Sequence, residues 1–304
     1  MDALIQSLVQ ANFAPERIAP QAPMAQYTTL RIGGPAEVMV NIHSADEIAV
    51  ALRAAKQADA PVTIIGNGSN LLVRDGGIRG LVLRISGGLN AIRREGDCLL
   101  VQAGASLAAV AAFARDEGLS GMAELGGIPG TVGGGVLMNA GAYGAELAQL
   151  VTQAEGVSLS DGRRVVYPAD RLDFAYRHSA LMDAGVVITQ ATLTLTPGAP
   201  EAIRARMEEC AKARREKQPL TLPSAGSTFK RPEGHFAAKL IDDCGLRGFT
   251  VGGAQVSEKH AGFIVNIGGA TARDMLELMR QVEQRVFEQT GVQLEPEVRI
   301  LGED

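Results

Sequence analysis

Two glycine-rich segments carry the backbone groups best suited to binding a phosphate. Residues 66–71 read GNGSNL, and residues 126–144 read GGIPGTVGGGVLMNAGAYG, with eight glycines in nineteen positions and no charge. Successive N–H groups that no side chain shields form concave sites for anionic oxygens. The two segments therefore predict a site for the phosphates of a nucleotide-type cofactor.

Neither segment matches a familiar phosphate-binding fingerprint. A Walker loop requires Lys-Ser or Lys-Thr after its second glycine, and neither segment contains that pair. Residues 66–71 begin as GxGxxG but end on Leu71 in place of the third glycine. No acidic residue closes a strand about twenty positions later, as the Rossmann pattern requires. The residues thus indicate a nucleotide-type cofactor in a non-Rossmann arrangement.

Residues 126–144 have three other interpretations. A membrane-spanning helix is disfavoured by the proline, the glycines and the polar Thr131 and Asn139. A flexible linker is disfavoured because Ile128, Val132 and Met138 require burial. A packed loop around a ligand fits best, and a purely structural buried turn stays open as the alternative.

Composition favours a soluble chain that acts on small molecules. The 304 residues suffice for two domains, and 46% hydrophobic content is ordinary for a globular protein. A net charge of −5 and the absence of Trp disfavour nucleic-acid binding. The three scattered cysteines, Cys98, Cys210 and Cys244, suit reduced thiols in a cytoplasm, with no disulfide framework and no metal site. The first twenty residues lack a signal-peptide pattern.

Hydrophobic periodicity and capping residues predict mixed helices and strands. Ser44 begins a capping box and Ser106 a second N-cap. The expected helices are residues 44–58, 106–117, 201–217, 235–245 and 271–289. The expected strands are residues 62–65, a second strand in the LLV stretch after the glycine loop, and residues 98–103, 157–159, 164–167, 186–195 and 262–266. Pro197-Gly198 marks a boundary, after which the composition becomes more charged. We expect an α+β fold with a first domain at 1–198 and a smaller α+β domain at 199–304.

Beyond these patterns, the chain resembles the UDP-N-acetylenolpyruvoylglucosamine reductase (MurB) family over about residues 25–302. The shared motifs, in the family's order, are TTLRIGG (28–34), IGNGSNLLV (65–73), GIPGTVGGGVLMNAGAYG (127–144), YRHS (176–179), PSAGSTFKRP (223–232), HFAAKLIDDCGLRGFTVGGAQVSEKHAGFIVN (235–266) and LEPEVRILG (294–302). The short spacing between Arg177 and Ser227 resembles the type II branch, which lacks a tyrosine-bearing substrate loop.

The resemblance implies a fold and a reaction. The fold is the vanillyl-alcohol-oxidase (PCMH) type, in which an FAD-binding domain of two α+β subdomains precedes a substrate-binding domain. The reaction is the NADPH-dependent, FAD-mediated reduction of UDP-N-acetylglucosamine enolpyruvate to UDP-N-acetylmuramate in peptidoglycan precursor synthesis. We expect non-covalent FAD, because no histidine or cysteine lies in a recognised covalent anchor. We also expect a monomer whose partners are the substrate and NADPH, without nucleic acid or membrane insertion.

The resemblance also assigns roles to individual residues. Arg177 matches the cation that stabilises the enolate-like intermediate, Ser227 the proton donor to C2, and Glu297 the catalytic glutamate. Without the motifs, these residues would be a surface or ion-paired arginine, a turn serine and a solvated carboxylate. The expected cofactor contacts are Gly66, Asn67, Gly68, Ser69, Asn70, Leu71, Gly127, Ile128, Pro129, Gly130, Thr131, Gly133, Gly134, Asn139, Ala140, Gly141 and Tyr143. The expected substrate contacts are Arg214, Lys217, Lys230, Arg231 and His260.

Two other functions stay open on sequence grounds. A flavin oxidase of the same fold would pass electrons to oxygen and would not require Ser227 and Glu297. A non-catalytic sugar-nucleotide-binding protein would take up no FAD and would be colourless. The colour of the purified protein and its response to the enolpyruvyl substrate separate these alternatives.

Overall fold

The computed structural model describes all of residues 1–304, and its internal contacts divide the chain into two compact units. Unit 1 comprises Met1–Pro20, Val38–Asn67 and Gly80–Arg214. Unit 2 comprises Gln21–Glu37, Gly68–Arg79 and Arg215–Asp304. This division places the last boundary after Arg214 rather than after residue 198, and it assigns two early segments to unit 2.

Both differences have a physical cause. Helix α5 (Pro200–Lys217) buries Ile203 and Cys210, and its Arg206 forms an ion pair with Glu124 at 2.7 Å, so most of this helix belongs to unit 1. Strand β4 (Leu71–Val73) pairs in parallel with β18 (Arg299–Leu301), so an early segment joins the last part of the chain.

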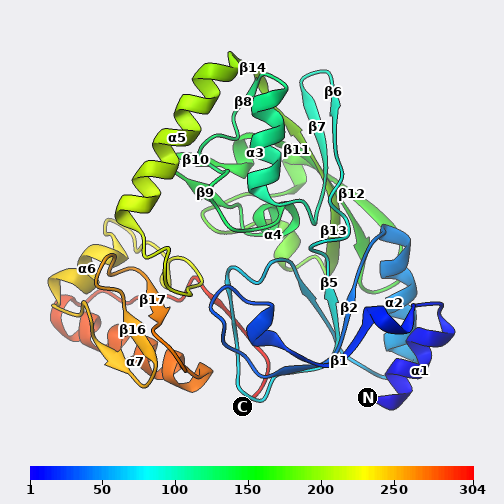
Figure 1. The fold of residues 1–304 in the computed structure, drawn as a ribbon, viewed down its shortest axis with the longest axis horizontal. Helices are drawn as coiled ribbons and strands as arrows, with labels where there is room; N and C mark the ends of the chain where they lie inside the picture. The colour runs from blue at the N-terminus through cyan, green and yellow to red at the C-terminus, as the bar shows by residue number, and fades with distance from the viewer. The chain divides into compact units, whose positions relative to one another are not determined.

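Unit 1 contains most of two sheets (Figure 1). The first has the order β1 (Ile18–Pro23), β2 (Pro35–Asn41), β5 (Ile78–Arg84) and β3 (Val62–Ile65). The second has the order β12 (Arg164–Pro168), β11 (Val151–Ser158), β13 (Val186–Thr194), β7 (Cys98–Gln102) and β6 (Ile92–Glu95). Strands β3 and β5 are parallel, whereas all pairs in the second sheet are antiparallel.

Unit 1 also has four helices besides α5. They are α1 (Asp2–Gln10), α2 (Ala45–Gln57), α3 (Leu107–Asp116) and α4 (Val132–Leu137). Ser44 and Ser106 cap α2 and α3 as predicted, because their hydroxyls accept from the N–H groups of Glu47 (3.2 Å) and Ala109 (3.1 Å). Short strands β8 (Leu119–Ser120) and β14 (Thr196–Pro197) pair with each other, as do β9 (Gly141–Ala142) and β10 (Ala145–Glu146).

The predicted capping box at α2 is only half formed. The Glu47 carboxylate accepts from the N–H of His43 (2.8 Å) and from the Arg17 guanidinium (2.6 Å). The hydrogen bonds from Arg17, more than any other influence, hold the pKa of Glu47 below its ordinary value. The expected return bond from Glu47 to the backbone of Ser44 is thus replaced, because a cation from outside the helix attracts the carboxylate more strongly.

Unit 2 packs two helices with a small antiparallel sheet. The sheet order is β15 (Thr250–Val251), β16 (Ala254–Val256) and β17 (Ile264–Asn266), and the helices are α6 (Ala237–Asp243) and α7 (Ala272–Thr290). The apolar face predicted for α7 is buried in the core, namely Met275, Leu278, Met279, Val282 and Val286. Thr271 caps α7 in a capping box with Asp274, and Gly291 ends it with a φ of 71°.

The structure confirms the predicted mixture of helices and strands. Every helix and strand expected from periodicity is present, and most ends differ by two residues or fewer. The exception is the strand expected at 157–159, which forms the end of the longer β11 (Val151–Ser158). Residues 126–144 form a turn, the short helix α4 and the β9–β10 hairpin, rather than a membrane span or a linker. No helix of the chain combines the length and the apolar character needed to cross a bilayer.

Candidate functional site

The first glycine segment presents unused backbone donors. Gly68 is buried with a φ of 63°, and a side chain there would collide with the carbonyl oxygen of Tyr27 at 2.1 Å. The Gly68 carbonyl accepts from the N–H of Thr29 (3.2 Å), but the N–H groups of Gly68, Ser69 and Asn70 donate to no acceptor in the chain. Because buried backbone N–H groups are nearly always paired, these donors fit an anionic ligand such as the diphosphate of a dinucleotide.

The second glycine segment uses its backbone donors differently. The N–H groups of Val132 and Gly133, in the first turn of α4, donate to the carbonyl oxygens of Ala105 and Ala103 (both 2.8 Å). That of Gly134 donates to the Thr131 hydroxyl at 3.4 Å. The N–H groups in the first turn of α4 therefore already have acceptors within the protein. Any contact of Gly133 with a ligand must involve an atom other than its amide nitrogen.

Several glycines in this segment are required by close packing. A Cβ at Gly126 would lie 2.7 Å from the Cβ of Ala111, and one at Gly133 would lie 2.9 Å from the Cβ of Ala103. Gly134 is exposed, and a Cβ there would make an ordinary contact of 3.5 Å with Thr131. The purely structural interpretation thus explains part of the segment, and the exposed Gly134 stays a candidate for contact with a ligand.

The two glycine segments meet at Thr131. A Cβ on Gly66 would lie 2.5 Å from the Thr131 hydroxyl oxygen, so the two residues are in close contact within unit 1. The Gly66 carbonyl also accepts from the Ser86 hydroxyl at 3.1 Å. The absence of a side chain at Gly66 permits this approach. The structure thereby brings together cofactor candidates from both segments.

Asn139 and Arg177 belong to two turns that are hydrogen-bonded to each other. The buried Asn139 amide nitrogen donates to the carbonyl oxygen of Ala175 and to the Glu146 carboxylate, each at 3.0 Å. The Arg177 guanidinium donates in return to the carbonyl oxygen of Gly141 at 3.2 Å. The expected cofactor contact Asn139 and the expected catalytic residue Arg177 are therefore neighbours.

Arg214 lies beside the second glycine segment. Its guanidinium carbon and nitrogen atoms line the space where a Cβ of Gly127 would be, the nearest nitrogen at 3.2 Å. Burial lowers the pKa of Arg214, while the nearby Tyr143 opposes that shift. The guanidinium forms no ion pair with any carboxylate of the chain. A half-buried cation without an acidic partner suits an anionic ligand.

Ser227 and Glu297 are held on neighbouring strand-like segments of unit 2. The Thr228 carbonyl accepts from the N–H of Glu297 at 2.8 Å, and the adjoining residues Phe229 and Pro296 form an antiparallel bridge. The Glu297 carbonyl in turn accepts from the side-chain amide of Asn70 at 3.1 Å. Neither Ser227 nor Glu297 is buried, and the Ser227 hydroxyl makes no hydrogen bond within the chain.

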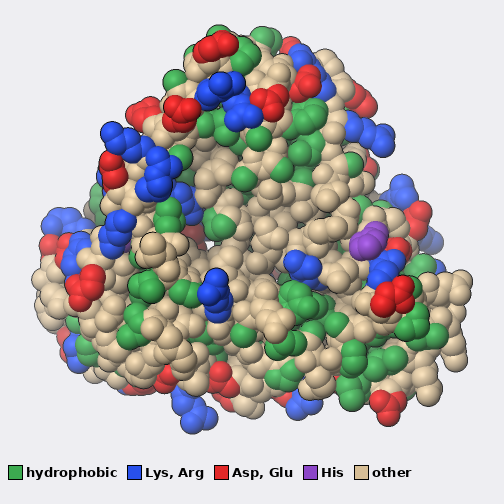
Figure 2. All heavy atoms as spheres, in the orientation of Figure 1, with side chains coloured by type: hydrophobic (Ala, Val, Ile, Leu, Met, Phe, Trp, Pro, Cys, Tyr) green, Lys and Arg blue, Asp and Glu red, His purple; other side chains and the backbone are tan.

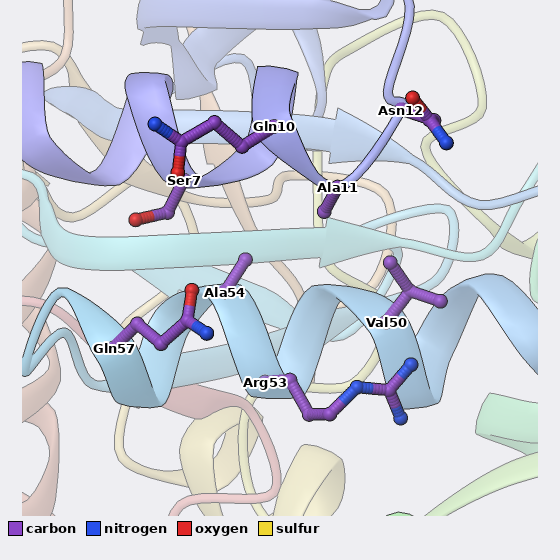
Figure 3. Close-up of a pocket in the computed structure, with 8 residues that line it drawn as sticks. All are labelled: Ser7, Gln10, Ala11, Asn12, Val50, Arg53, Ala54 and Gln57. Atoms are coloured by element: carbon purple, nitrogen blue, oxygen red, sulfur yellow. The ribbon is translucent and has the colours of Figure 1, made fainter.

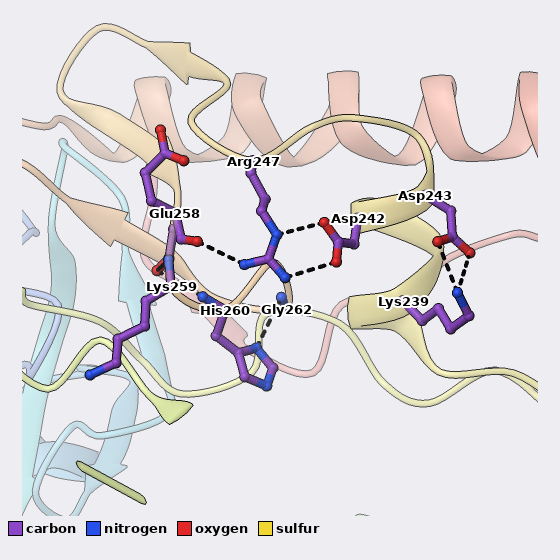
Figure 4. A network of polar contacts seen from close by, with 9 residues as sticks. Lys239, Asp242, Asp243, Arg247, Glu258, Lys259, His260 and Gly262 are labelled. Atoms are coloured by element: carbon purple, nitrogen blue, oxygen red, sulfur yellow. Dashed lines mark hydrogen bonds and ion pairs between the residues drawn. The ribbon is translucent and has the colours of Figure 1, made fainter. Parts of the chain in front are cut away.

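Lys217 and His260 line one cavity of unit 2. Its volume is ≈ 420 Å³, and it also borders Lys239, Arg247 and Lys259. Figure 4 shows the network on one side of it, in which Arg247 forms a bidentate pair with Asp242 at 2.5 and 2.8 Å. Lys217 takes part in none of the ion pairs of the chain, so its ammonium could bind an anion.

His260 has a structural contact as well as a place in this cavity. Its Nδ1 accepts from the N–H of Gly262 at 3.1 Å (Figure 4). Its ring also packs edge-on against Phe263, with the ring centres 4.9 Å apart. Burial lowers the pKa of the imidazole, so the neutral form is favoured. A neutral His260 offers its other ring nitrogen as a hydrogen-bond donor. The neutral ring has no positive charge that would attract a phosphate.

Lys230 and Arg231 already have partners. The Lys230 ammonium forms an ion pair with Glu295 at 3.3 Å, and its backbone N–H donates to the Glu295 carbonyl at 2.8 Å. The Arg231 guanidinium stacks 4.5 Å from the centre of the exposed Phe236 ring. Each would have to exchange or share this contact to bind a substrate phosphate.

A second cavity contains none of the predicted site residues. It measures ≈ 380 Å³ and lies between α1 and α2, where Gln10, Asn12, Arg53 and Gln57 line it (Figure 3). Basic and acidic side chains are interspersed on the face shown in Figure 2, and no cluster of His, Cys, Asp or Glu could hold a metal ion.

Sequence reasoning missed residues that shape the site through the backbone. Thr228, the residue after Ser227, is held by two hydrogen bonds: its N–H donates to the carbonyl oxygen of Gly262, and its hydroxyl accepts from the N–H of Ile264. Ser179, fully buried, donates to the carbonyl oxygen of Leu137 at 2.8 Å. The Glu146–Gln149 spacing, which forms a capping box here, was a local signal that could have identified Glu146.

Comparison with known proteins agrees with these features. The family model "FAD binding domain" matches residues 36–167, and "UDP-N-acetylenolpyruvoylglucosamine reductase, C-terminal domain" matches residues 218–301. Curated proteins named UDP-N-acetylenolpyruvoylglucosamine reductase are similar over nearly their whole length. That of Pediococcus pentosaceus is 47% identical and covers 98% of this chain and 99% of its own. That of Agathobacter rectalis is 50% identical and covers 92% and 93%.

A solved structure extends the similarity to the fold. The crystal structure of UDP-N-acetylenolpyruvylglucosamine reductase (MurB) from Thermus caldophilus superposes with a TM-score of 0.80 at 38% identity, covering 92% of this chain and 97% of that one. The predicted PCMH-type FAD-binding fold, followed by a C-terminal domain, is thereby confirmed. The cofactor of the first domain is FAD. On these identities and coverages, the chain belongs to the UDP-N-acetylenolpyruvoylglucosamine reductase family.

Proposed function

We propose that this chain reduces UDP-N-acetylglucosamine enolpyruvate to UDP-N-acetylmuramate, with NADPH as reductant and non-covalently bound FAD. The reaction serves peptidoglycan precursor synthesis in the cytoplasm, and the three free cysteines suit that reducing compartment. Support comes from relatives named for this reductase activity and from an FAD-binding domain model. We infer that the chain works as a monomer.

FAD would be held chiefly through its diphosphate. The unused N–H groups of Gly68, Ser69 and Asn70 are the donors that fit it. Gly66 and Thr131, which are in close contact within unit 1, are further candidates for contact with FAD. The chemistry that FAD supplies when bound is the transfer of a hydride from NADPH to C3 of the enolpyruvyl group.

The chain's own residues must then stabilise charge and supply a proton. Hydride arrival at C3 moves negative charge through C2 onto the substrate carboxylate, and the Arg177 guanidinium stabilises that charge. The Ser227 hydroxyl donates its proton to C2, which completes the addition of two hydrogens across the double bond. Glu297 hydrogen-bonds the developing charge or returns a proton to the Ser227 oxygen.

The observation that carries this proposal is the state of Ser227. Its hydroxyl has no partner in the chain, while the neighbouring Thr228 is fixed by hydrogen bonds from Glu297 on one side and to Gly262 on the other. A proton donor needs this combination of a free hydroxyl on a rigid backbone. If Ser227 had a purely structural role, we would expect its hydroxyl to form a hydrogen bond with a nearby backbone group of the turn.

Substrate phosphates would bind at the basic residues. Lys217, with His260 as a neutral donor in the same cavity, suits the UDP diphosphate. Arg214 offers a second unpaired cation, in unit 1. Lys230 and Arg231 are weaker candidates because Glu295 and Phe236 already engage them.

Anaerobic rapid-mixing experiments test the function. The purified protein should be yellow, and NADPH should bleach the flavin absorbance. Addition of UDP-N-acetylglucosamine enolpyruvate should restore that absorbance within a turnover and release UDP-N-acetylmuramate. Reoxidation by oxygen but not by this substrate would indicate a flavin oxidase. A colourless protein that takes up no FAD would indicate a binding protein and would refute the proposal.

A further inference from the structure

Backbone strain is concentrated in two short segments of unit 1 that contain turns, residues 139–143 and 173–177. Of the eight non-glycine residues with positive φ, four lie in these segments: Asn139 (43°), Tyr143 (53°), Asp173 (42°) and Arg177 (54°). Residues other than glycine adopt such angles only where surrounding contacts hold them, and such strain clusters at functional sites. The contacts that hold these two turns therefore bear on the side chains that the turns carry.

Arg177 is the second central residue of a tight turn. The N–H of His178 donates to the carbonyl oxygen of Ala175, and the N–H of Ala175 donates to the carbonyl oxygen of His178, both at 3.1 Å. Tyr176 and Arg177 form the two-residue loop between them. The position that Arg177 occupies favours glycine or asparagine, so the turn alone would not fix an arginine there.

The Asn139 side chain stabilises the turn that carries Arg177. Its side chain is almost fully buried, at 1% exposure. One amide hydrogen donates to the carbonyl oxygen of Ala175, the other to the Glu146 carboxylate (each 3.0 Å), and the amide oxygen accepts from the N–H of Ala148 (2.9 Å). Both amide hydrogens are thus used within the chain, which leaves no donor for a cofactor.

We propose that Asn139 is a positioning residue for Arg177, not a cofactor contact. It binds the carbonyl oxygen of the residue that opens the Arg177 turn, and Arg177 binds back to Gly141 in the segment that carries Asn139. These two bonds tie the turns together and fix the direction of the guanidinium. The inference rests on the proposed role of Arg177 in stabilising the substrate's developing charge.

Two variants separate this role from cofactor contact and from general stability. Asn139→Asp keeps the shape and the acceptor for Ala148 but loses both donors and places a carboxylate against Glu146. The double variant Asn139→Asp/Glu146→Gln restores a donor between positions 139 and 146. It does not restore the bond to Ala175. Glu146→Gln alone keeps every bond of Asn139, since the glutamine oxygen can accept, and it serves as the matched control.

The measurements are the melting temperature, the FAD dissociation constant, the rate of flavin reduction by NADPH and the rate of flavin reoxidation by the enolpyruvyl substrate. We expect the double variant to melt at a lower temperature than Glu146→Gln, because the Ala175 carbonyl loses its donor. Assayed well below that temperature, it should match Glu146→Gln in FAD affinity and in the rate of flavin reduction by NADPH. Its reoxidation by substrate should fall on the order of 10²-fold, because a small misplacement of a catalytic group has that effect. The KM for NADPH should stay unchanged.

Two outcomes overturn the proposal. Weaker FAD binding in the folded double variant would make Asn139 a cofactor contact, and an unchanged rate of substrate reduction would make the Ala175 bond irrelevant to Arg177. Failure of the proposed function has a different signature. In that case the wild-type protein itself would show no reoxidation by the enolpyruvyl substrate, whatever the variants do.

Discussion

Exchanging two glycines of the 126–144 segment for alanine tests which of them serve packing and which face outward. Gly126 and Gly134 both have ordinary negative φ, so an alanine is conformationally acceptable at either position. The two differ in their surroundings. A methyl group at Gly126 would lie 2.7 Å from the Cβ of the buried Ala111 on α3, whereas one at Gly134 would meet only Thr131, at 3.5 Å.

The expected changes have opposite signs. Carbon atoms pack at about 3.5–4.0 Å, so Gly126→Ala creates an overlap of about 1 Å that Ala111 has no side-chain freedom to relieve. Such overpacking costs about 1–3 kcal/mol. Gly134→Ala fills open space on a helix and removes backbone freedom from the unfolded chain, which stabilises by about 0.5–1 kcal/mol. The free energies of unfolding of the two variants should thus differ by roughly 1.5–4 kcal/mol.

Urea unfolding followed by circular dichroism, without added FAD, measures this difference. A subsequent FAD titration measures affinity separately, because a ligand that binds the folded state adds to its stability. If Gly134 faces the cofactor, Gly134→Ala should weaken FAD binding while the protein itself becomes more stable. Equal unfolding free energies for the two variants, or a Gly134→Ala protein less stable than Gly126→Ala, would refute the packing argument.

Three further predictions follow from single side chains. In rapid-mixing kinetics, Ser227→Ala should leave the reduction of the flavin by NADPH nearly intact and slow the reduction of the enolpyruvyl substrate by about 10²–10⁴-fold. An equal loss of both steps would contradict a proton-donor role. Glu47→Gln should lower the free energy of unfolding by about 1 kcal/mol at neutral pH. Because its partner Arg17 lowers the pKa of Glu47 from 4.5, that stabilisation is present above pH 4.5 and is lost as the pH falls through the lowered pKa, so urea curves of wild type and variant should converge in acid. Asn266→Ala should lower the free energy of unfolding by about 2–4 kcal/mol in the same urea assay. The reason is that the buried Asn266 side chain donates to the Leu30 carbonyl and accepts from the N–H groups of Gly268 and Ala270. A decrease of less than about 0.5 kcal/mol would contradict that reasoning.

The elements predicted correctly from the sequence are those whose formation depends on residues close by in the chain. Ser44, Ser106 and Thr271 each precede a periodic apolar stretch, and each caps the helix that follows. The strand at residues 62–65 was predicted with its observed bounds. Features that depend on distant partners have no local signal in the sequence. The three residues of β4 carry no sign that β18 will pair with them, and the unit boundary inside α5 depends on contacts such as that of Arg206 with Glu124.

The candidate site shows the same limit. The sequence correctly marked residues 126–144 as a packed loop, but a count of glycines does not reveal that Ala103 and Ala105 take the first N–H groups of α4. It named Asn139 as a cofactor contact, a prediction that its three internal hydrogen bonds disfavour. The roles of Arg177, Ser227 and Glu297 came from family resemblance, because none of them has a local pattern that distinguishes it from an ordinary surface residue.

The pairing of β4 with β18 has a consequence for synthesis on the ribosome. Asn70, in the loop with the unused N–H donors, binds Glu297, which lies 227 positions later in the chain. At about 5–20 residues per second, the nascent chain exposes β4 for roughly 10–45 s before its partner strand is made. Strand β4 therefore leaves the ribosome well before the strand with which it pairs in the folded protein. The strand that completes the cofactor loop is among the last parts of the chain to be translated.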